Sequence, residues 1–283
     1  MLLQINCLLI FFRTTSRGTR PNINIIRKFK IPNLSRPFFA SSTSHPLDSK
    51  RKKTREMGIL YDNTDNTFIV TIGGYKIKTT VTASYITASN WIDEVLRFTG
   101  QWRKPVTVGL DIVWCPHKWH GRSGQNPVAL LQLCVGSRCL LFQLLHCGRI
   151  PDNLHQFFLD NRYRFVGVDV KNDLEKLEEQ FGLIAGSCWD DLRKLAEEKT
   201  GRSDLKQADL KTLLEEFVGL CLGKSFWTRT SDWGTQVLDL EQIEYAAFDA
   251  FASCQVGHRL VSIGSVWIVG RKKNKKEEEE KKL

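Results

Sequence analysis

The sequence lacks three features that would each indicate a class of protein: a long apolar run, paired cysteines and a phosphate-binding loop. No apolar run reaches the ~18 residues that a membrane-spanning helix requires, so the sequence does not predict a transmembrane protein. The 8 cysteines include no Cys-x-x-Cys pair, which favours buried, reduced thiols over a redox motif or a disulfide framework. The glycine-rich segment 219–225 is not a phosphate-binding loop, because it has one residue too few between its glycines and follows a helical pattern. We therefore expect no nucleotide-driven motor.

A zinc site is also not expected. Cys115, His117 and His120 lie close together, but a structural zinc ion needs four ligands and no second ligand pair lies nearby. What the sequence does have is material for a core: 42% of its residues are hydrophobic, including 16 phenylalanines and 8 tryptophans. A chain of 283 residues with this composition predicts one large domain with extensions.

Acidic residues are missing from residues 1–47, which carry seven Lys or Arg and many hydroxyl side chains. This composition is typical of a mitochondrial or plastid transit peptide. The alternative is an upstream extension that is not part of the native protein, because Met57 is one of only 2 methionines and begins the globular sequence. The protein would then be nuclear or cytoplasmic, and the basic run 50–53 is compatible with nuclear import or with a linker.

The formal net charge of +10 belongs to the ends of the chain. Residues 1–56 hold 12 basic and 2 acidic residues, and the tail from Arg271 holds 7 basic and 4 acidic residues. The body, 57–270, is near −3, so any nucleic-acid contact there must be local. We predict three parts: a basic leader and linker (1–56), a folded domain (57–265) and a charged, disordered tail (266–283).

Hydrophobic periodicity predicts an α/β fold with a mixed sheet flanked by helices. Gly73-Gly74 divides two alternating segments and indicates a hairpin over 67–80. Three apolar runs follow one another without helices between them and predict an antiparallel meander. Helical patterns dominate afterwards, around one more strand. The predicted strands of this part are 106–114, 128–135, 139–142 and 164–170; the predicted helices are one capped by Ser89, then 151–159, 173–181, 190–199, 209–218 and 240–260.

Three acids stand out in apolar surroundings, where an unpaired carboxylate is costly to bury. Asp111 closes the strand 106–114, and Asp173 lies at the start of a helix. Asp249 lies four residues after Tyr245, so the two share a helix face. Each acid also has a local alternative: Asp111 caps a turn, Asp173 is the N-cap of its helix, or Asp249 pairs with an arginine, such as Arg229 or Arg259.

Four stretches in order resemble the DEDD superfamily of 3′–5′ exonucleases, in its tyrosine-bearing branch, and within it the plant Werner-syndrome-like exonucleases. The resemblance covers residues 66–262. The stretches are Val108-Gly-Leu-Asp-Ile-Val-Trp114, Asn126-Pro-Val-Ala-Leu-Leu-Gln-Leu-Cys134, Phe165-Val-Gly-Val-Asp-Val-Lys-Asn-Asp-Leu-Glu-Lys-Leu177, and Ser231-Asp-Trp233 leading to Gln242-Ile-Glu-Tyr-Ala-Ala-Phe-Asp-Ala250.

The resemblance implies an RNase H-like exonuclease fold and hydrolysis at DNA or RNA 3′ ends. In the family, four carboxylates hold two divalent cations, Mg²⁺ or Mn²⁺, about 3.5–4 Å apart. Asp111, Asp173 and Asp249 would be metal ligands here, and Tyr245 would position the attacking water. Trp114 would stack on the terminal base; the alternative is that it is a core aromatic.

The sequence departs from the family at Val113. The first family motif is Asp-x-Glu, whose two carboxylates share one face of a strand. Valine cannot coordinate a cation, so one ligand is missing. Three interpretations follow: the protein is a disabled nuclease that acts as a nucleic-acid-binding or adaptor protein, Asp169 (where the family has Gly) replaces the ligand, or Val113 is peculiar to this one sequence.

Overall fold

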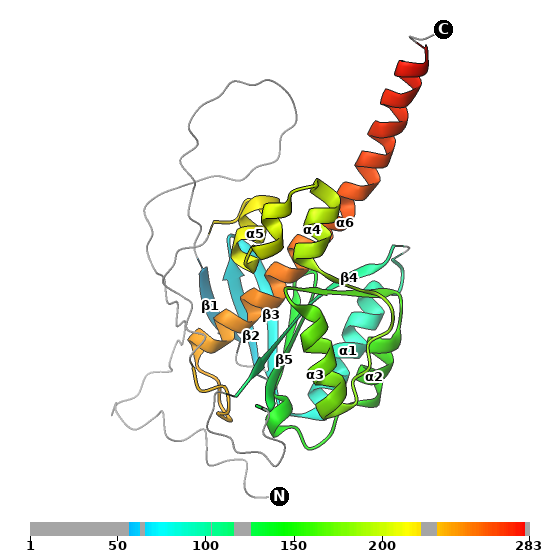
Figure 1. Cartoon of the computed structure of the whole chain (residues 1–283). Coiled ribbons are helices and arrows are strands. Elements are labelled where there is room, and N and C mark those ends of the chain that lie inside the picture. The colour runs from blue at the N-terminus through cyan, green and yellow to red at the C-terminus, as the bar shows by residue number, and fades with distance from the viewer. Residues whose placement is uncertain (1–56, 63–65, 103, 116–125, 222–230, 281–283) are drawn as a thin grey trace, which may run out of the picture.

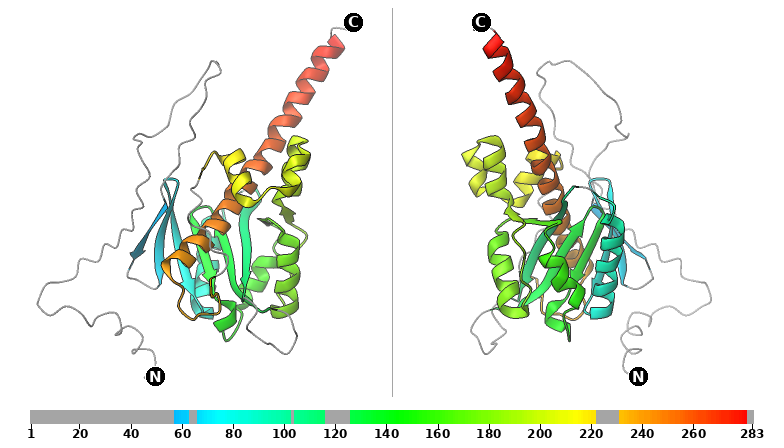
Figure 2. Two further views of the ribbon diagram at one scale, coloured as in Figure 1. Left: turned by 60° about the vertical axis from the view of Figure 1, so that its left-hand side comes forward. Right: turned by 90° about the vertical axis from the view of Figure 1, so that its right-hand side faces the viewer.

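The computed structural model describes residues 57–62, 66–102, 104–115, 126–221 and 231–280. The predicted leader, His117, His120, Arg229 and most of the glycine-rich segment 219–225 lie outside these residues. The described part forms one eight-stranded mixed sheet with helices on both faces (Figures 1 and 2), which confirms the predicted fold class. The elements in chain order are β1 Met57–Asp62, β2 Thr67–Ile72, β3 Tyr75–Thr82, α1 Tyr85–Thr99, β4 Val106–Trp114, β5 Val128–Val135, β6 Arg138–Phe142, η1 Leu144–His146, α2 Asp152–Leu159, β7 Tyr163–Gly167, α3 Val170–Phe181, β8 Trp189–Asp191, α4 Leu192–Thr200, η2 Ser203–Gln207, α5 Leu210–Val218 and α6 Leu240–Glu280.

The strand order is β1-β2-β3-β6-β5-β4-β7-β8, with β4 between β5 and β7. The hairpin β2–β3 and the antiparallel meander β4–β5–β6 are confirmed. β7 pairs parallel with β4 and β8 parallel with β7, and β3 joins β6 in parallel. The edge strands β1 and β8 were not predicted: β8 has only three residues, too few for an alternating pattern to show.

Two hydrophobic clusters cover the two faces of the sheet. Helices α1, α2 and α3 share one cluster with the β4 residues Val106, Val108, Leu110 and Ile112. Helices α4, α5 and α6 share the other cluster, and Val113 packs against it. Because side chains alternate along a strand, Asp111 and Val113 both face the α6 side.

The starts of helices α1 and α3 differ from the predictions. Helix α1 begins at Tyr85, four residues before the predicted region of Ser89, because Ser84 is the N-cap and accepts a hydrogen bond from Thr87 N. Helix α3 begins at Val170, because the strand before it ends at Gly167 and a left-handed turn follows. Asp173 therefore lies in the first turn of α3 and is not its N-cap.

Helix α6 runs from Leu240 to Glu280, through the segment that was predicted to be a disordered tail. Lys and Glu have high helix propensity, and no proline interrupts the segment. Figure 1 shows the N-terminal part of α6 crossing the sheet and the C-terminal part extending beyond it. In the described part of the chain, no helix is long and apolar enough to cross a membrane. Gly219, part of the glycine-rich segment, is the left-handed C-cap of α5.

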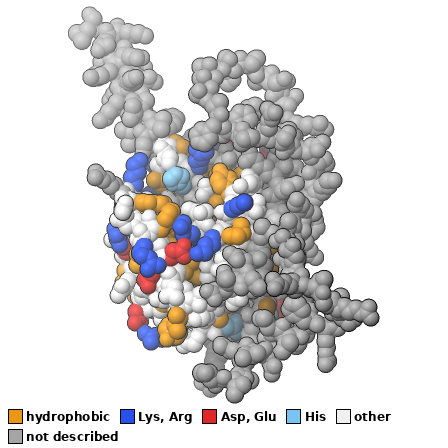
Figure 3. Space-filling model, turned by 180° about the vertical axis from the view of Figure 1, so that it is seen from behind, with side chains coloured by type: hydrophobic (Ala, Val, Ile, Leu, Met, Phe, Trp, Pro, Cys, Tyr) orange, Lys and Arg blue, Asp and Glu red, His pale blue; other side chains and the backbone are white. Residues whose placement is uncertain are grey.

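Figure 3 shows the molecule from behind, with Lys and Arg side chains interspersed among acidic and hydrophobic ones on the described surface. This mixed surface agrees with the small net charge of the body, so local groups must supply any attraction for an anionic ligand.

Candidate active site

One cavity of about 530 Å³ lies where β4, α3, α4 and α6 meet. All five residues to which the sequence assigned a role line it: Asp111, Trp114, Asp173, Tyr245 and Asp249. They come from three segments that span almost 140 positions of the chain, and the fold brings them together. Their chemical roles stay predictions.

A close approach between α6 and β4 sets the position of Asp249 over the sheet. Gly109 lies two residues before Asp111 on the same face of β4. A methyl group at Gly109 would overlap the carbonyl oxygen of Ala250 and lie 2.6 Å from the backbone nitrogen of Cys254. The missing side chain therefore lets the backbone of α6 rest directly on the strand, beside the two acids.

Asp173 is the most perturbed acid of the cavity. Its side chain is buried, and its Oδ2 atom has no hydrogen-bond partner among the described residues. Burial, followed by the negative charges of Asp111, Asp169 and Asp191, raises the pKa of Asp173 to about 9, although Lys176 acts in the opposite direction. The cavity therefore concentrates negative charge, which a bound cation would offset.

The carboxylates that line the cavity are chemically suited to bind a hard divalent cation. Carboxylate oxygens are preferred ligands of Mg²⁺ and Mn²⁺, and Asp173 offers a buried oxygen without a partner. As the described side chains stand, however, no group of three His, Cys, Asp or Glu is assembled closely enough to hold an ion. Val113 also lines the cavity, and its side chain has no donor atom for a cation.

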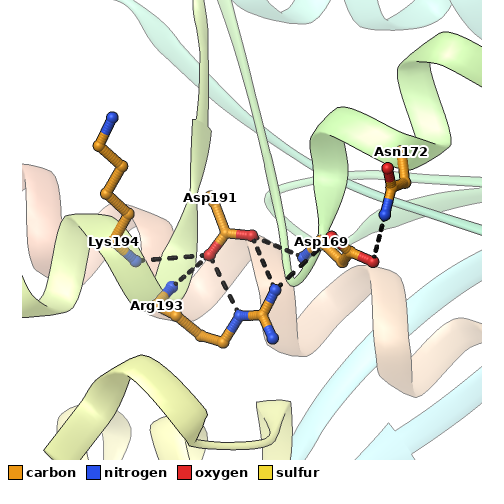
Figure 4. Close-up of polar contacts among 5 residues, drawn as sticks. All are labelled: Asp169, Asn172, Asp191, Arg193 and Lys194. Carbon is orange, nitrogen blue, oxygen red and sulfur yellow. Dashed lines mark hydrogen bonds and ion pairs between the residues drawn. The ribbon is translucent and has the colours of Figure 1, made fainter.

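Asp169 lies in the same cavity, but not on a strand as predicted. It precedes α3 with φ 63°, a left-handed conformation that non-glycine residues rarely adopt. Its Oδ2 accepts a hydrogen bond from Asn172 Nδ2 at 2.7 Å, and its Oδ1 lies 3.7 Å from Arg193 Nη2 (Figure 4). The carboxylate is thus already engaged by two partners, of which Arg193 lines the cavity.

Trp114 is 43% exposed, so the interpretation as a core aromatic is wrong. Lys176 Nζ lies 4.5 Å from the centre of the Trp114 ring, a cation–π arrangement. Trp114 also lines a second hollow of about 410 Å³ together with Lys176 and Asn172. An exposed aromatic face between two hollows is suited to stacking on a base, and that role stays a prediction.

The segment around Trp233 supports Tyr245. The two rings have their centres 5.9 Å apart, and Trp233 is buried in the cavity wall. His146 Nε2 lies 2.9 Å from the carbonyl oxygen of Gly234 and 3.1 Å from that of Thr235, which holds the segment in place. The sequence motif contained Trp233, but its packing against Tyr245 could not be read from the spacing.

Arg193 was missed altogether by sequence reasoning. It lines the cavity from the first turn of α4 and pairs with Asp191, the N-cap of that helix. Burial alone would raise the pKa of Asp191, but hydrogen bonds from Arg193 and from the backbone of Asp169 outweigh it and lower the pKa. The only available signal was an arginine two residues after a capping aspartate, which is common on protein surfaces.

Part of the chain is similar in sequence to known proteins. Residues 116–264 match the 3′–5′ exonuclease family, a range that includes Asp173, Tyr245 and Asp249 and begins just after β4. A 3′–5′ exonuclease of Arabidopsis thaliana is 36% identical over 149 residues, which are 52% of this chain and 49% of the relative. Human exonuclease 3′–5′ domain-containing protein 2 is 33% identical over 148 residues, 50% of this chain and 23% of the relative. The chain thus spans half or less of the curated relatives it matches.

Two solved structures share the fold. Escherichia coli RNase D, an exoribonuclease involved in structured RNA processing, gives a TM-score of 0.53 at 22% identity, covering 66% of this chain and 45% of that chain. The exonuclease domain of Aedes aegypti Nibbler gives 0.53 at 18% identity, covering 65% and 88%. Because the family match takes in more than half of the sequence, the chain belongs to the 3′–5′ exonuclease family.

Proposed function

We propose that this protein removes nucleotides from the 3′ end of DNA or RNA, using Mg²⁺ or Mn²⁺ held by Asp111, Asp173 and Asp249. The observation that carries the proposal is the convergence of these acids on one cavity, where the buried Asp173 Oδ2 has no partner among the described residues. The narrower assignment to the plant Werner-syndrome-like group is part of this proposal, and its support is that one relative is a plant 3′–5′ exonuclease.

The residues of the cavity would have different roles in phosphodiester hydrolysis. Bound divalent cations would supply positive charge at the reacting phosphate and favour ionisation of a water. Asp111 on β4 and Asp249 on α6 line the same cavity and would hold that charge in place. Tyr245, one helical turn before Asp249, would orient the attacking water through its hydroxyl, and Trp114 would stack on the terminal base at the edge of the cavity.

Val113 sets the level of activity. With three carboxylates in place of four, the site binds its cations more weakly, so hydrolysis requires a higher metal concentration. Val113 shares the face of Asp111 and lines the cavity, so a glutamate at this position would project into the same space.

A second candidate function rests on the same residue. A chain that binds nucleic acid in this cavity without turnover would act as a binding or adaptor protein, and the loss of a ligand at Val113 favours it. The intact Asp111, Asp173, Tyr245 and Asp249 favour the exonuclease, because a site without catalytic use has no reason to retain all four of these groups in one cavity.

One digestion experiment separates the two functions. A duplex with a labelled, recessed 3′ end is incubated with the full chain in Mg²⁺ or Mn²⁺, beside Val113→Glu and Asp249→Ala. We expect slow digestion by the native chain, faster digestion by Val113→Glu and none by Asp249→Ala. Activity of Val113→Glu alone would establish the non-catalytic function, and digestion that persists in Asp249→Ala would place the chemistry elsewhere.

A further inference from the structure

Arg193 is held in one orientation by its neighbour Asp191. The Asp191 carboxylate accepts a hydrogen bond from the backbone nitrogen of Arg193 at 2.9 Å, which caps α4. The same carboxylate pairs with Arg193 Nε at 3.3 Å and with Nη2 at 3.2 Å (Figure 4). One acid therefore fixes both the backbone and the guanidinium, which removes much of the rotamer freedom of a long side chain.

The fixed guanidinium borders the acidic cavity. Arg193 is the only basic residue among the described residues that line it, and its side chain is 28% exposed. Nε and Nη2 are engaged by Asp191, and Nη2 also lies 3.7 Å from Asp169. The remaining terminal nitrogen, Nη1, has no hydrogen-bond partner among the described residues and offers two N–H donors.

The charge of the cavity makes such a cation necessary for a nucleic-acid strand. Five aspartates line the cavity, and residues 57–270 carry a net charge near −3. A strand brings one negative phosphate for each nucleotide, so only local cations can favour its entry. Arginine is suited to this contact, because its planar guanidinium matches the oxygens of a phosphate.

We propose that Arg193 binds a backbone phosphate of the substrate strand through Nη1, with Asp191 as the residue that positions it. The proposal rests on the proposed function, because it assigns a contact within the same site. The pair with Asp169 is loose at 3.7 Å, so a phosphate oxygen can take up the remaining Nη2 donor without breaking the pair with Asp191. Asp169 then keeps the hydrogen bond from Asn172 Nδ2 and stays outside the set of metal ligands.

The chain contains a matched control for this pair. Arg164 forms an ion pair with Asp190 at 3.1 Å, one residue before Asp191 on the same edge strand. The side chain of Arg164 is 34% exposed, close to the 28% of Arg193. Arg164 does not line the cavity. If the loss of any arginine–aspartate pair at this edge has a general effect, replacing Arg164 and replacing Arg193 should both produce it. An effect that is specific to strand binding should arise only when Arg193 is replaced.

The test measures binding without hydrolysis. The full chain is titrated into a fluorescent single-stranded DNA oligonucleotide in EDTA, and anisotropy is followed at several salt concentrations. Arg193→Gln is expected to weaken binding by about tenfold or more and to reduce the slope of log K against log salt by about 0.7, the value for one lost contact with a single strand. Arg193→Lys should keep the slope, and Arg164→Gln should bind as the native chain does.

The outcomes separate this proposal from the proposed function. Equal affinity and slope for Arg193→Gln and the native chain would overturn the phosphate contact, as would an equal loss in Arg164→Gln. In the digestion experiment, Arg193→Gln should raise KM with a smaller change in kcat. If the native chain digests the duplex while Arg193→Gln keeps the native KM, the exonuclease function stands and only the role of Arg193 fails. If the native chain binds no oligonucleotide in EDTA, the phosphate contact fails, and the digestion experiment in Mg²⁺ or Mn²⁺ decides the exonuclease function separately.

Discussion

Gln132 lies directly across the antiparallel β4–β5 ladder from Asp111. Residues paired in this way share a face of the sheet and have Cβ atoms about 4.5–5.5 Å apart. Gln132 is completely buried, and neither its amide oxygen nor its amide nitrogen has a partner among the described residues. A buried amide left without partners costs about 1–3 kcal/mol. We infer that this side chain serves the site and not the stability of the core, by orienting Asp111 when a cation is bound.

Replacing Gln132 with leucine should therefore separate stability from metal binding. Leucine fills a similar volume without polar atoms, so the free energy of unfolding should stay the same or increase. Affinity for Mn²⁺ should fall by about 10- to 100-fold, the usual effect of losing a group that orients a ligand. Denaturant unfolding and calorimetric titration with Mn²⁺ measure the two effects.

Gln180 provides the comparison for that variant. Its Oε1 accepts a hydrogen bond from the backbone nitrogen of Val128 at 2.8 Å, away from the acids. Gln180→Leu should lose stability, because Val128 N–H is then unpaired, and keep the native affinity for Mn²⁺. The interpretation of Gln132 would be refuted by the opposite pattern, in which Gln132→Leu unfolds more easily and binds Mn²⁺ normally.

The raised pKa of Asp173 predicts how stability depends on pH in the metal-free protein. An aspartate in the unfolded chain has a pKa of about 3.9, whereas burial and neighbouring acids raise the pKa of Asp173 to about 9 in the folded chain. Between these values the folded state binds more protons than the unfolded state, so the contribution of Asp173 to stability falls as the pH rises.

Thermal unfolding in EDTA at several pH values tests this dependence. The native Tm should decrease from about pH 5 to pH 9, and the Tm of Asp173→Asn should decrease less. Addition of Mn²⁺ should raise the native Tm most at high pH, because a cation stabilises the ionised carboxylate. Parallel curves for the two proteins would show that Asp173 is not the group responsible.

The contact between β4 and α6 predicts a strong effect of a single methyl group. Gly109→Ala would force the backbone of Ala250 away from the strand, with the helix turn that carries Asp249. Overpacking of this kind costs about 1–3 kcal/mol, and digestion should fall together with stability. Gly148→Ala is the control, because a Cβ atom there meets no other atom within 4 Å. A fully active and stable Gly109→Ala would mean that α6 does not rest on β4 as closely as described.

The fold, and the site residues that lie within sequence motifs, could be predicted from the sequence. The period-2 alternation in β2 and β3 and the three apolar runs of the meander are local signals, and they predicted their elements. The residues that line the cavity were found where a motif surrounds them, as at Asp111 and Tyr245. The features that could not be predicted are the three-residue β8, the packing of Trp233 on Tyr245, and the pairing of Arg193 with Asp191 at the cavity. They depend on how the chain packs in three dimensions. The left-handed turn at Asp169 could not be predicted either. Glycine is the residue that normally indicates such a turn, and this position holds an aspartate.

We expect that Asp169 does not replace the carboxylate that Val113 lacks. If Asp169 replaced the ligand lost at Val113, Asp169→Gly would remove a bound Mn²⁺ ion; we expect instead that the stoichiometry of Mn²⁺ binding is unchanged. The Asp169 carboxylate is engaged by Asn172 and Arg193, and glycine suits the left-handed backbone. Stability should change by no more than about 1 kcal/mol, because relief of the positive φ offsets the lost contacts. Calorimetric titration of the native chain, Asp169→Gly and Val113→Glu with Mn²⁺ measures this. A gain of Mn²⁺ affinity in Val113→Glu with no loss in Asp169→Gly would show that the cavity works with three carboxylates. Loss of a Mn²⁺ site in Asp169→Gly would identify Asp169 as the substitute ligand.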